Sequence, residues 1–355
     1  MKRFILLLTL IALPGCMDGS RKLTLAFISN NPHEFWTIAR RGTEAAAKTF
    51  DINVEFYMPA YGTASEQHRI VEDLVVKGVK GIAISPNDAG HQSRVLDGII
   101  PKNVGFITQD SDLPPGSKRL CYIGTDNVKA GWAVGKLVME ALGEKGGKIM
   151  IYVGMLDVQN AQERRQGVIA ALGGFKVEEA KSAAAKKLAA PDHITNLSGK
   201  YEILGTMTDQ GSFPKCKSNV EDTLNKYGDI NCMVGLWAYN PPAMLQGVKA
   251  AGKLGTIKLV GFDEDEETLQ AIKDGAIYAT VVQNPYMFGF MAMDILQHQA
   301  RKGRLPDYIP ADRNCYVPHR VIRRKDQVQK GQLFDEDVEE FHKDLKEKKR
   351  GALIQ

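Results

Sequence analysis

The sequence has little of three things that would narrow its function quickly: charge of one sign, cysteine and long apolar runs. Its formal net charge is only +4 over 355 residues, and Lys2 and Arg3 supply two of those charges. Such a balance is not the signature of a nucleic-acid-binding protein. After residue 13, no apolar stretch approaches the roughly 20 residues that span a bilayer.

Cysteine is scarce, with five residues whose spacing matches no zinc-binding motif. Cys16 lies near the amino terminus and four others follow, an even number that permits disulfides in an exported chain. Cys216 precedes a predicted helix and Cys232 lies in the strand after it, so this pair is a candidate disulfide. Separate buried thiols are the alternative, and pairing of Cys121 with Cys315 stays open. No metal or other cofactor is expected.

The amino terminus has the pattern of an export signal. Met1-Lys2-Arg3 precedes the apolar run Phe4 to Leu13, which is too short to span a bilayer. Leu13-Pro14-Gly15-Cys16 then resembles a bacterial lipobox, in which the cysteine is lipidated and becomes the first residue. We predict a signal peptide over residues 1–15 and a lipid anchor at Cys16, which places the protein in the periplasm or at the cell surface. Ordinary export with a free Cys16 is the alternative.

The chain is rich in apolar runs that alternate with helical patterns. Such a βαβ series buries a parallel sheet between two layers of helices. The series runs from Leu23 to Thr108 and starts again from Lys148 to Val282. A chain of 355 residues also exceeds what one hydrophobic core usually supports. The sequence therefore predicts an α/β fold with two doubly wound parallel-sheet lobes.

The lobes are expected to be joined by a hinge of three segments, near Asp126, Asn284 and Val317. A helix is predicted over residues 287–301, after the second series, and the next predicted strand is a single one over residues 314–321. We expect this helix to pack on the first lobe. The predicted domains are residues 1–15 (signal peptide), 22–125 with 284–316 (first lobe), 126–283 with 317–334 (second lobe) and 335–355 (charged tail).

Two further segments stand apart by composition. Residues 177–200 are rich in Ala, Lys and Ser and are predicted to form a surface insertion. The tail from residue 335 is highly charged and is predicted to be a solvated helix.

Polar and aromatic side chains follow the carboxyl ends of the predicted strands, where open α/β sheets bind ligands. Planar carboxylate, guanidinium and amide groups can each hold neighbouring hydroxyls, and aromatic rings cover a C–H face. A monosaccharide has both kinds of surface. The candidates are Asn31, Phe35, Trp36, Asp110, Arg164, Asn240, Asp263 and Gln283, with Asn30, Trp237 and Tyr239 as further candidates.

Each candidate taken alone has a simpler explanation. Asn31 beside Pro32 is typical of a turn, and Asn240 and the strand-end aspartates could cap helices. An arginine such as Arg164 could lie on a solvated helix face. Capping does not explain Arg164 and Gln283 together, so the whole set favours a binding site.

Enzyme motifs are incomplete. "HEFWT" at His33 lacks the second histidine of a zinc protease, and "GEKGGKI" at Gly143 lacks the Ser or Thr that a phosphate loop needs after its lysine. A glycosidase needs two carboxylates on opposite sides of a bond. Asp110 and Asp263 come from different lobes, but neither has an obvious reason for a raised pKa. We therefore predict that the protein is not an enzyme.

Seven motifs occur in a characteristic order: "NNPHEFWTIARRG" at Asn30, "GIAISPND" at Gly81, "FITQDSD" at Phe106, "IGTDNVKAGW" at Ile123, "ERRQG" at Glu163, "VGFDEDEETLQAIKDG" at Val260 and "ATVVQNPYMFG" at Ala279. From Leu23 to Val321 the chain thereby resembles the periplasmic sugar-binding proteins of the ribose- and galactose-binding type (type I) that feed ABC transporters. The resemblance places the family's sugar contacts on the eight main candidates.

The resemblance implies a monomer that binds a pentose or hexose and delivers it to the membrane permease of an ABC transporter. Two departures put ribose itself in doubt: His33 and Glu34 lengthen the segment before the aromatic pair, and Ser111 stands where ribose binders carry an arginine. The same lobes also serve chemoreceptors, sensor kinases and lac-repressor-type regulators. The signal sequence and the lack of an N-terminal helix-turn-helix disfavour the regulator.

Overall fold

The computed structural model describes residues 22–328 and 335–349. The predicted signal peptide and the predicted anchor at Cys16 lie outside the described residues. Within them, every helix is too short or too polar to cross a bilayer.

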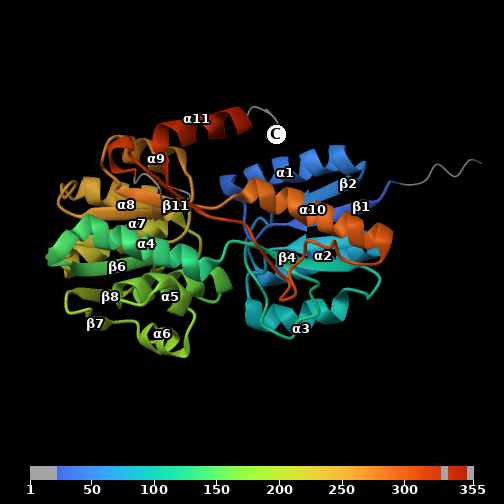
Figure 1. Cartoon of the computed structure of the whole chain (residues 1–355), viewed down its shortest axis with the longest axis horizontal. Helices are drawn as coiled ribbons and strands as arrows, with labels where there is room; N and C mark the ends of the chain where they lie inside the picture. Colours follow the sequence, from blue (N-terminus) through green and yellow to red (C-terminus); the bar gives the residue numbers. More distant parts are fainter. Residues whose placement is uncertain (1–21, 329–334, 350–355) are drawn as a thin grey trace, which may run out of the picture.

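Two predominantly parallel sheets form the centres of two lobes that lie side by side (Figure 1). The first sheet contains β1 (Thr24–Ile28), β2 (Asn53–Tyr57), β3 (Gly81–Ile84), β4 (Gly105–Gln109), β5 (Tyr122–Gly124) and β12 (Asn314–Tyr316), in the order β12-β5-β4-β3-β1-β2. The second contains β6 (Gly147–Val153), β7 (Ile194–Leu197), β8 (Tyr201–Thr208), β9 (Cys232–Gly235), β10 (Lys258–Phe262), β11 (Ala279–Val282), β13 (Arg320–Arg323) and β14 (Asp335–Asp337), in the order β14-β13-β11-β10-β9-β6-β8-β7. The prediction of a two-lobed, doubly wound α/β fold is confirmed.

Helices cover both faces of each sheet (Figure 1). The first lobe carries α1 (Glu34–Phe50), α2 (Ala64–Lys77), α3 (Ala89–Ile99) and α10 (Pro285–Lys302), and the second carries α4 (Asn127–Leu142), α5 (Gln159–Leu172), α6 (Ala183–Leu188), α7 (Phe213–Lys226), α8 (Asn240–Ala250), α9 (Glu266–Lys273) and α11 (Val338–Lys349). Local sequence sets their ends, as α2 shows. The Thr63 side chain accepts a hydrogen bond from the Glu66 N–H at the start of α2, and Gly78 ends the helix with φ of +80°.

The chain passes between the sheets three times: from β5 to α4, from β11 to α10 and from β12 to β13. Helix α10 packs against α1 and the first sheet, whereas α4 packs against the second sheet. The single strand predicted over residues 314–321 is wrong, because β12 and β13 lie in different sheets. Pro318 has no N–H to continue a strand ladder and separates them. The exact lobe boundaries stay a prediction.

The charged tail is not a solvated helix. β14 pairs in parallel with β13, and α11 packs against α9 (Figure 1). Val338, Phe341 and Leu345 recur at helical spacing and are buried, and the Arg320 guanidinium lies 4.7 Å from the centre of the Phe341 ring. The apolar stripe is hidden in the sequence by the charges that surround it.

Two other predictions for the second lobe need correction. Residues 177–200 are more than a surface insertion, because they contain α6 and β7, and β7 pairs antiparallel with β8 at the sheet edge. The candidate disulfide is absent, since Cys216 and Cys232 are both free and buried. Cys216 lies beside Asn240, which follows the carboxyl end of β9, whereas Cys232 begins that strand. The two thiols therefore lie toward opposite ends of β9.

Candidate ligand-binding site

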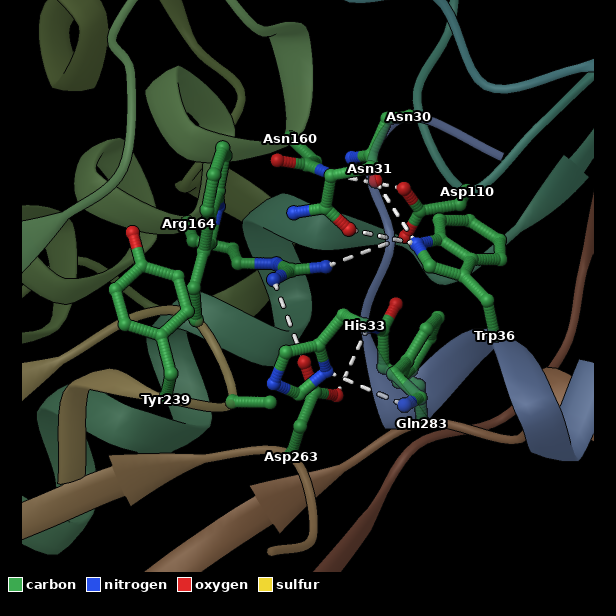
Figure 2. Close-up of a pocket in the computed structure, with 13 residues that line it drawn as sticks. Asn30, Asn31, His33, Trp36, Asp110, Asn160, Arg164, Tyr239, Asp263 and Gln283 are labelled. Carbon is green, nitrogen blue, oxygen red and sulfur yellow. Dashed lines mark hydrogen bonds and ion pairs between the residues drawn. The ribbon is translucent and has the colours of Figure 1, made fainter. Parts of the chain in front are cut away.

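A cavity of about 360 Å³ lies between the lobes (Figure 2). The loops after β1 and β4 and the first turn of α1 line it from the first lobe; α5 and the loops after β9, β10 and β11 line it from the second. All predicted site residues except Asn240 line this cavity: Asn30, Asn31, Phe35, Trp36, Asp110, Arg164, Trp237, Tyr239, Asp263 and Gln283.

Arg164 lies at the centre of the cavity lining, with its guanidinium between carboxylates from both lobes (Figure 2). Nη2 is 3.8 Å from Asp110 Oδ1, and Nη1 is 3.9 Å from Asp263 Oδ2. Nη1 also donates a hydrogen bond of 2.9 Å to the Leu236 carbonyl, and the guanidinium packs 3.9 Å from the centre of the Phe262 ring. The side chain is 2% exposed, so the solvated-face alternative is wrong for Arg164.

The two aspartates share an uncommon backbone conformation. Asp110 has φ of +59° and Asp263 has φ of +63°, in the left-handed region that few residues other than glycine adopt. Each backbone N–H donates to a carbonyl of the neighbouring strand, that of Ile123 at 2.9 Å and that of Val281 at 2.7 Å. Residues held in such conformations cluster at functional sites.

Burial raises the pKa of both carboxyl groups, and that of Asp263 reaches about 6. The positive charge of Arg164 opposes the effect of burial at both groups. The expectation that neither aspartate has a reason for a raised pKa is therefore wrong. Ser85 donates to Asp110 at 2.9 Å, and Gln283 Nε2 donates to Asp263 at 2.9 Å, so both carboxyl groups also accept hydrogen bonds.

The aromatic pair begins α1 and forms a wall of the cavity. The Trp36 indole N–H donates to Asn30 Oδ1 at 2.9 Å and to Asn31 Oδ1 at 3.1 Å. The Phe35 ring meets the Trp36 ring edge-on, with centres 5.0 Å apart. The first-lobe amides thus hold the indole in place through their oxygens.

Four cavity-lining side chains of the second lobe carry a buried polar atom that has no hydrogen-bond partner among the described residues. Two are acceptors, Asn160 Oδ1 and Gln283 Oε1, and two are donors, Arg164 Nη2 and Trp237 Nε1. A ligand that excludes water from the cleft and leaves such an atom without a hydrogen bond loses about 1 to 3 kcal/mol per atom. The cavity therefore suits a small ligand that both donates and accepts hydrogen bonds.

Asn240 is the predicted residue that does not line the cavity. Its Oδ1 accepts a hydrogen bond of 2.9 Å from the backbone N–H of Trp237, and its Nδ2 donates to Asp209 Oδ2 at 3.0 Å. Asn240 therefore supports the loop that carries Trp237 and Tyr239, and this geometry does not favour direct ligand contact.

Two polar lining residues, His33 and Asn160, were not among the candidates. Asn160 lies four residues before Arg164 on α5, so helical spacing alone places both side chains on one face. Its Nδ2 donates to Asp110 Oδ2 across the cleft at 3.1 Å. His33 stood out in the sequence because it begins the incomplete "HEFWT" motif and lengthens the loop before the aromatic pair.

Two parallel α/β lobes with a polar cavity between them, at the carboxyl ends of their strands, define a two-lobed binding protein. Residues 26–304 match the family model described as periplasmic binding protein domain, and the chain belongs to this family. This family consists of substrate-binding proteins rather than enzymes. Membership in it supports the prediction that the protein is exported to the periplasm.

Two relatives whose names state the sugar they bind support the predicted resemblance to periplasmic sugar-binding proteins. The D-allose-binding periplasmic protein of Escherichia coli (strain K12) is 26% identical over 291 residues, which cover 80% of this chain and 85% of that protein. The ribose import binding protein RbsB of Bacillus subtilis (strain 168) is 27% identical over 266 residues, 75% of this chain and 76% of RbsB.

A solved structure agrees in fold. An ABC transporter solute-binding protein from Burkholderia graminis, in complex with D-arabinose, aligns with a TM-score of 0.74 and 24% identity, over 87% of this chain and 98% of that one.

Proposed function

We propose that the protein binds one monosaccharide, a pentose or hexose, between its lobes and delivers it to the membrane permease of an ABC transporter. The observation that carries this proposal is the set of two donors and two acceptors around one cavity that have no hydrogen-bond partner in the described part of the chain. Each hydroxyl of a sugar both donates and accepts, so a single ring can pair all four atoms. The names of the relatives, which bind D-allose or ribose, support the same ligand class.

In this proposal each kind of side chain has a separate task. Asp110 and Asp263 accept hydrogen bonds from sugar hydroxyls, and Arg164 donates to hydroxyl oxygens. The rings of Trp36 and Tyr239 cover the C–H faces of the sugar. A sugar that lacks one of the matching hydroxyls leaves a buried group unpaired, at a cost of about 1 to 3 kcal/mol, and is rejected.

Ligand binding favours closure because the contact set comes from both lobes. The sugar meets groups such as Asp110 and Arg164 together only when the cleft is closed, so it stabilises the closed arrangement. The hinge consists of the three chain crossings. No bond is made or broken in this cycle, and it needs no cofactor.

Export and anchoring complete the proposal. Signal-peptide cleavage before Cys16 and lipidation of its thiol tether a monomeric protein to the membrane that holds the permease. Cys16→Ser is expected to release the protein into the soluble fraction, which fractionation followed by immunoblotting measures. A Cys16→Ser protein that stays with the membrane contradicts the anchor.

A thermal-denaturation panel tests the proposed ligand class. D-ribose, D-allose, D-arabinose and the common hexoses are each added to the purified protein, and a bound sugar raises the midpoint of unfolding. Incubation mixtures are then analysed for products. No shift with any sugar contradicts the ligand class, and formation of a product contradicts the binding-only role.

A further inference from the structure

His33 occupies the loop between β1 and α1 and reaches the cavity from the first lobe (Figure 2). As the residue before α1, its Nδ1 accepts a hydrogen bond of 3.2 Å from the Phe35 N–H. A ring nitrogen that accepts a hydrogen bond carries no proton, so the ring is the neutral tautomer with its hydrogen on Nε2. The position of the ring thus follows from the start of α1.

Tyr239 faces His33 from the second lobe, on the loop between β9 and α8. The two ring centres are 6.3 Å apart, and the ring planes are tilted by 55°. The Tyr239 hydroxyl donates to the buried carboxylate of Asp209, whose second oxygen accepts from Asn240 at 3.0 Å. This ring is also held by its own lobe.

Both rings are therefore positioned before the lobes meet, and their contact forms where the cleft closes beside the cavity. Contacts between pre-positioned groups lose little conformational freedom on forming, and aromatic pairs at this distance attract each other. We propose that His33 is a positioning residue and forms a latch that holds the cleft closed. Its neutral ring packs against Tyr239 and slows the release of the bound sugar. Acid weakens this contact. The inference rests on the proposed function and adds a release device to it.

The groups around His33 decide how it responds to acid. Burial lowers the pKa of His33, and the negative charges of Asp265 at the start of α9 and Glu34 in α1 oppose this effect. Tyr239 stays neutral, because burial raises its pKa. Arg164 and Asp263 line the same cavity.

In this proposal part of the burial that lowers the pKa of His33 comes from closure, so the neutral ring favours the closed cleft above the ordinary pKa of about 6.5 and this effect is lost as the pH falls. Protonation of Nδ1 also removes the acceptor for the Phe35 N–H. Acid therefore weakens the latch.

The test compares His33→Ala, His33→Phe and the wild type in binding D-ribose, D-allose and D-arabinose at pH 7.5 and pH 5.5. His91→Ala is the matched control, because His91 lies in the first lobe with its side chain 81% exposed. At pH 7.5, His33→Ala is expected to release the sugar about 2- to 10-fold faster, as an aromatic pair is lost. His33→Phe keeps a ring but loses the acceptor for the Phe35 N–H, so its release rate is expected to lie between those of the wild type and His33→Ala.

The pH dependence separates this role from a merely structural one. The wild type and His91→Ala are expected to lose more affinity between pH 7.5 and pH 5.5 than His33→Phe, because only histidine gains a charge. Identical pH profiles for wild type and His33→Phe overturn the latch even if His33→Ala fails to fold. Unchanged release by a folded His33→Ala overturns it as well. The same comparison is made with whichever sugar of the thermal panel binds if these three do not; if the wild type binds no sugar of that panel, the proposed function fails instead, and the latch with it.

Discussion

Each lobe has an aspartate at an equivalent point of its sheet, but the surroundings of the two aspartates differ. Asp110 follows β4 and Asp263 follows β10, strands that hold the same place in the orders β2-β1-β3-β4-β5 and β8-β6-β9-β10-β11, and both residues have positive φ. In the first lobe, the oxygens of Asn30 and Asn31 are already bonded to Trp36. Of the described residues, the four cavity-lining side chains with a buried polar atom that lacks a hydrogen bond all belong to the second lobe.

The difference indicates that the second lobe supplies more of the groups that recognise the ligand. The first lobe supplies Asp110 and an aromatic wall whose indole N–H is already bonded within that lobe. The second lobe supplies donors and acceptors that a ligand must satisfy. Substitutions in the second lobe should therefore change ligand recognition more than equivalent substitutions in the first.

The largest effect is expected from Arg164→Ala. The change leaves the Asp110 and Asp263 carboxyl groups buried without their cation, which costs about 3 to 5 kcal/mol of unfolding free energy. The variant should also lose the stabilisation by sugar. Urea denaturation with and without sugar measures both effects.

Arg165→Ala is the matched control for that prediction. Arg165 is also buried, but it donates to Thr206 Oγ1 at 2.7 Å and to the Ala189 carbonyl, away from the cavity. Its removal should lower stability and leave the response to sugar intact. A sugar response that survives Arg164→Ala and disappears in Arg165→Ala would reverse the assignment.

A second large effect concerns the carboxyl-terminal segment, which only the second lobe carries. Phe341→Ala removes a buried ring and should lower the unfolding free energy by about 3 to 5 kcal/mol, with no change in sugar affinity. Lys343→Ala, on the exposed side of α11, should change neither quantity. An unaltered urea midpoint for Phe341→Ala would show that α11 does not contribute to the core.

Asparagines from the two lobes provide the sharpest test of the comparison. Asn160→Ala removes an unpaired acceptor and should weaken sugar binding by about 1 to 3 kcal/mol, or roughly 5- to 150-fold. Asn31→Ala should cost less affinity, because the Trp36 indole keeps its bond to Asn30. Calorimetric titration of both variants gives the ratio directly. A greater loss for Asn31→Ala would break the comparison.

The smallest effect is a pH dependence beside the hinge. Burial raises the pKa of Glu163 to about 7, Lys181 opposes the shift, and the negative charges of Asp126 and Asp112 add to it. A carboxyl group with a raised pKa favours the folded form while protonated. This contribution is complete below the ordinary pKa and is lost as the pH rises to about 7.

Glu163→Gln removes this contribution and should flatten the stability profile between pH 5 and pH 8. Denaturation midpoints across that range, for wild type and variant side by side, check the slope. Parallel profiles would mean that Glu163 does not titrate there.

Much of the fold and of the site could be predicted from the sequence because the patterns that indicate them are local. Apolar runs alternate with helical patterns, and Asp110 and Asp263 directly follow such runs, so their place at the sheet edge could be predicted. The direction of the Asn240 amide could not, since it depends on Asp209, 31 residues away in the chain. The burial of Phe341 was hidden for a similar reason: its partners are distant, and its neighbours in sequence are charged.

The most direct test of the account is a crystal structure with the sugar that the thermal panel identifies. One monosaccharide is expected between the lobes, hydrogen-bonded to Asn160 Oδ1, Gln283 Oε1, Arg164 Nη2 and Trp237 Nε1. Sugar bound elsewhere, or held in the cleft without contact to those four atoms, would contradict it.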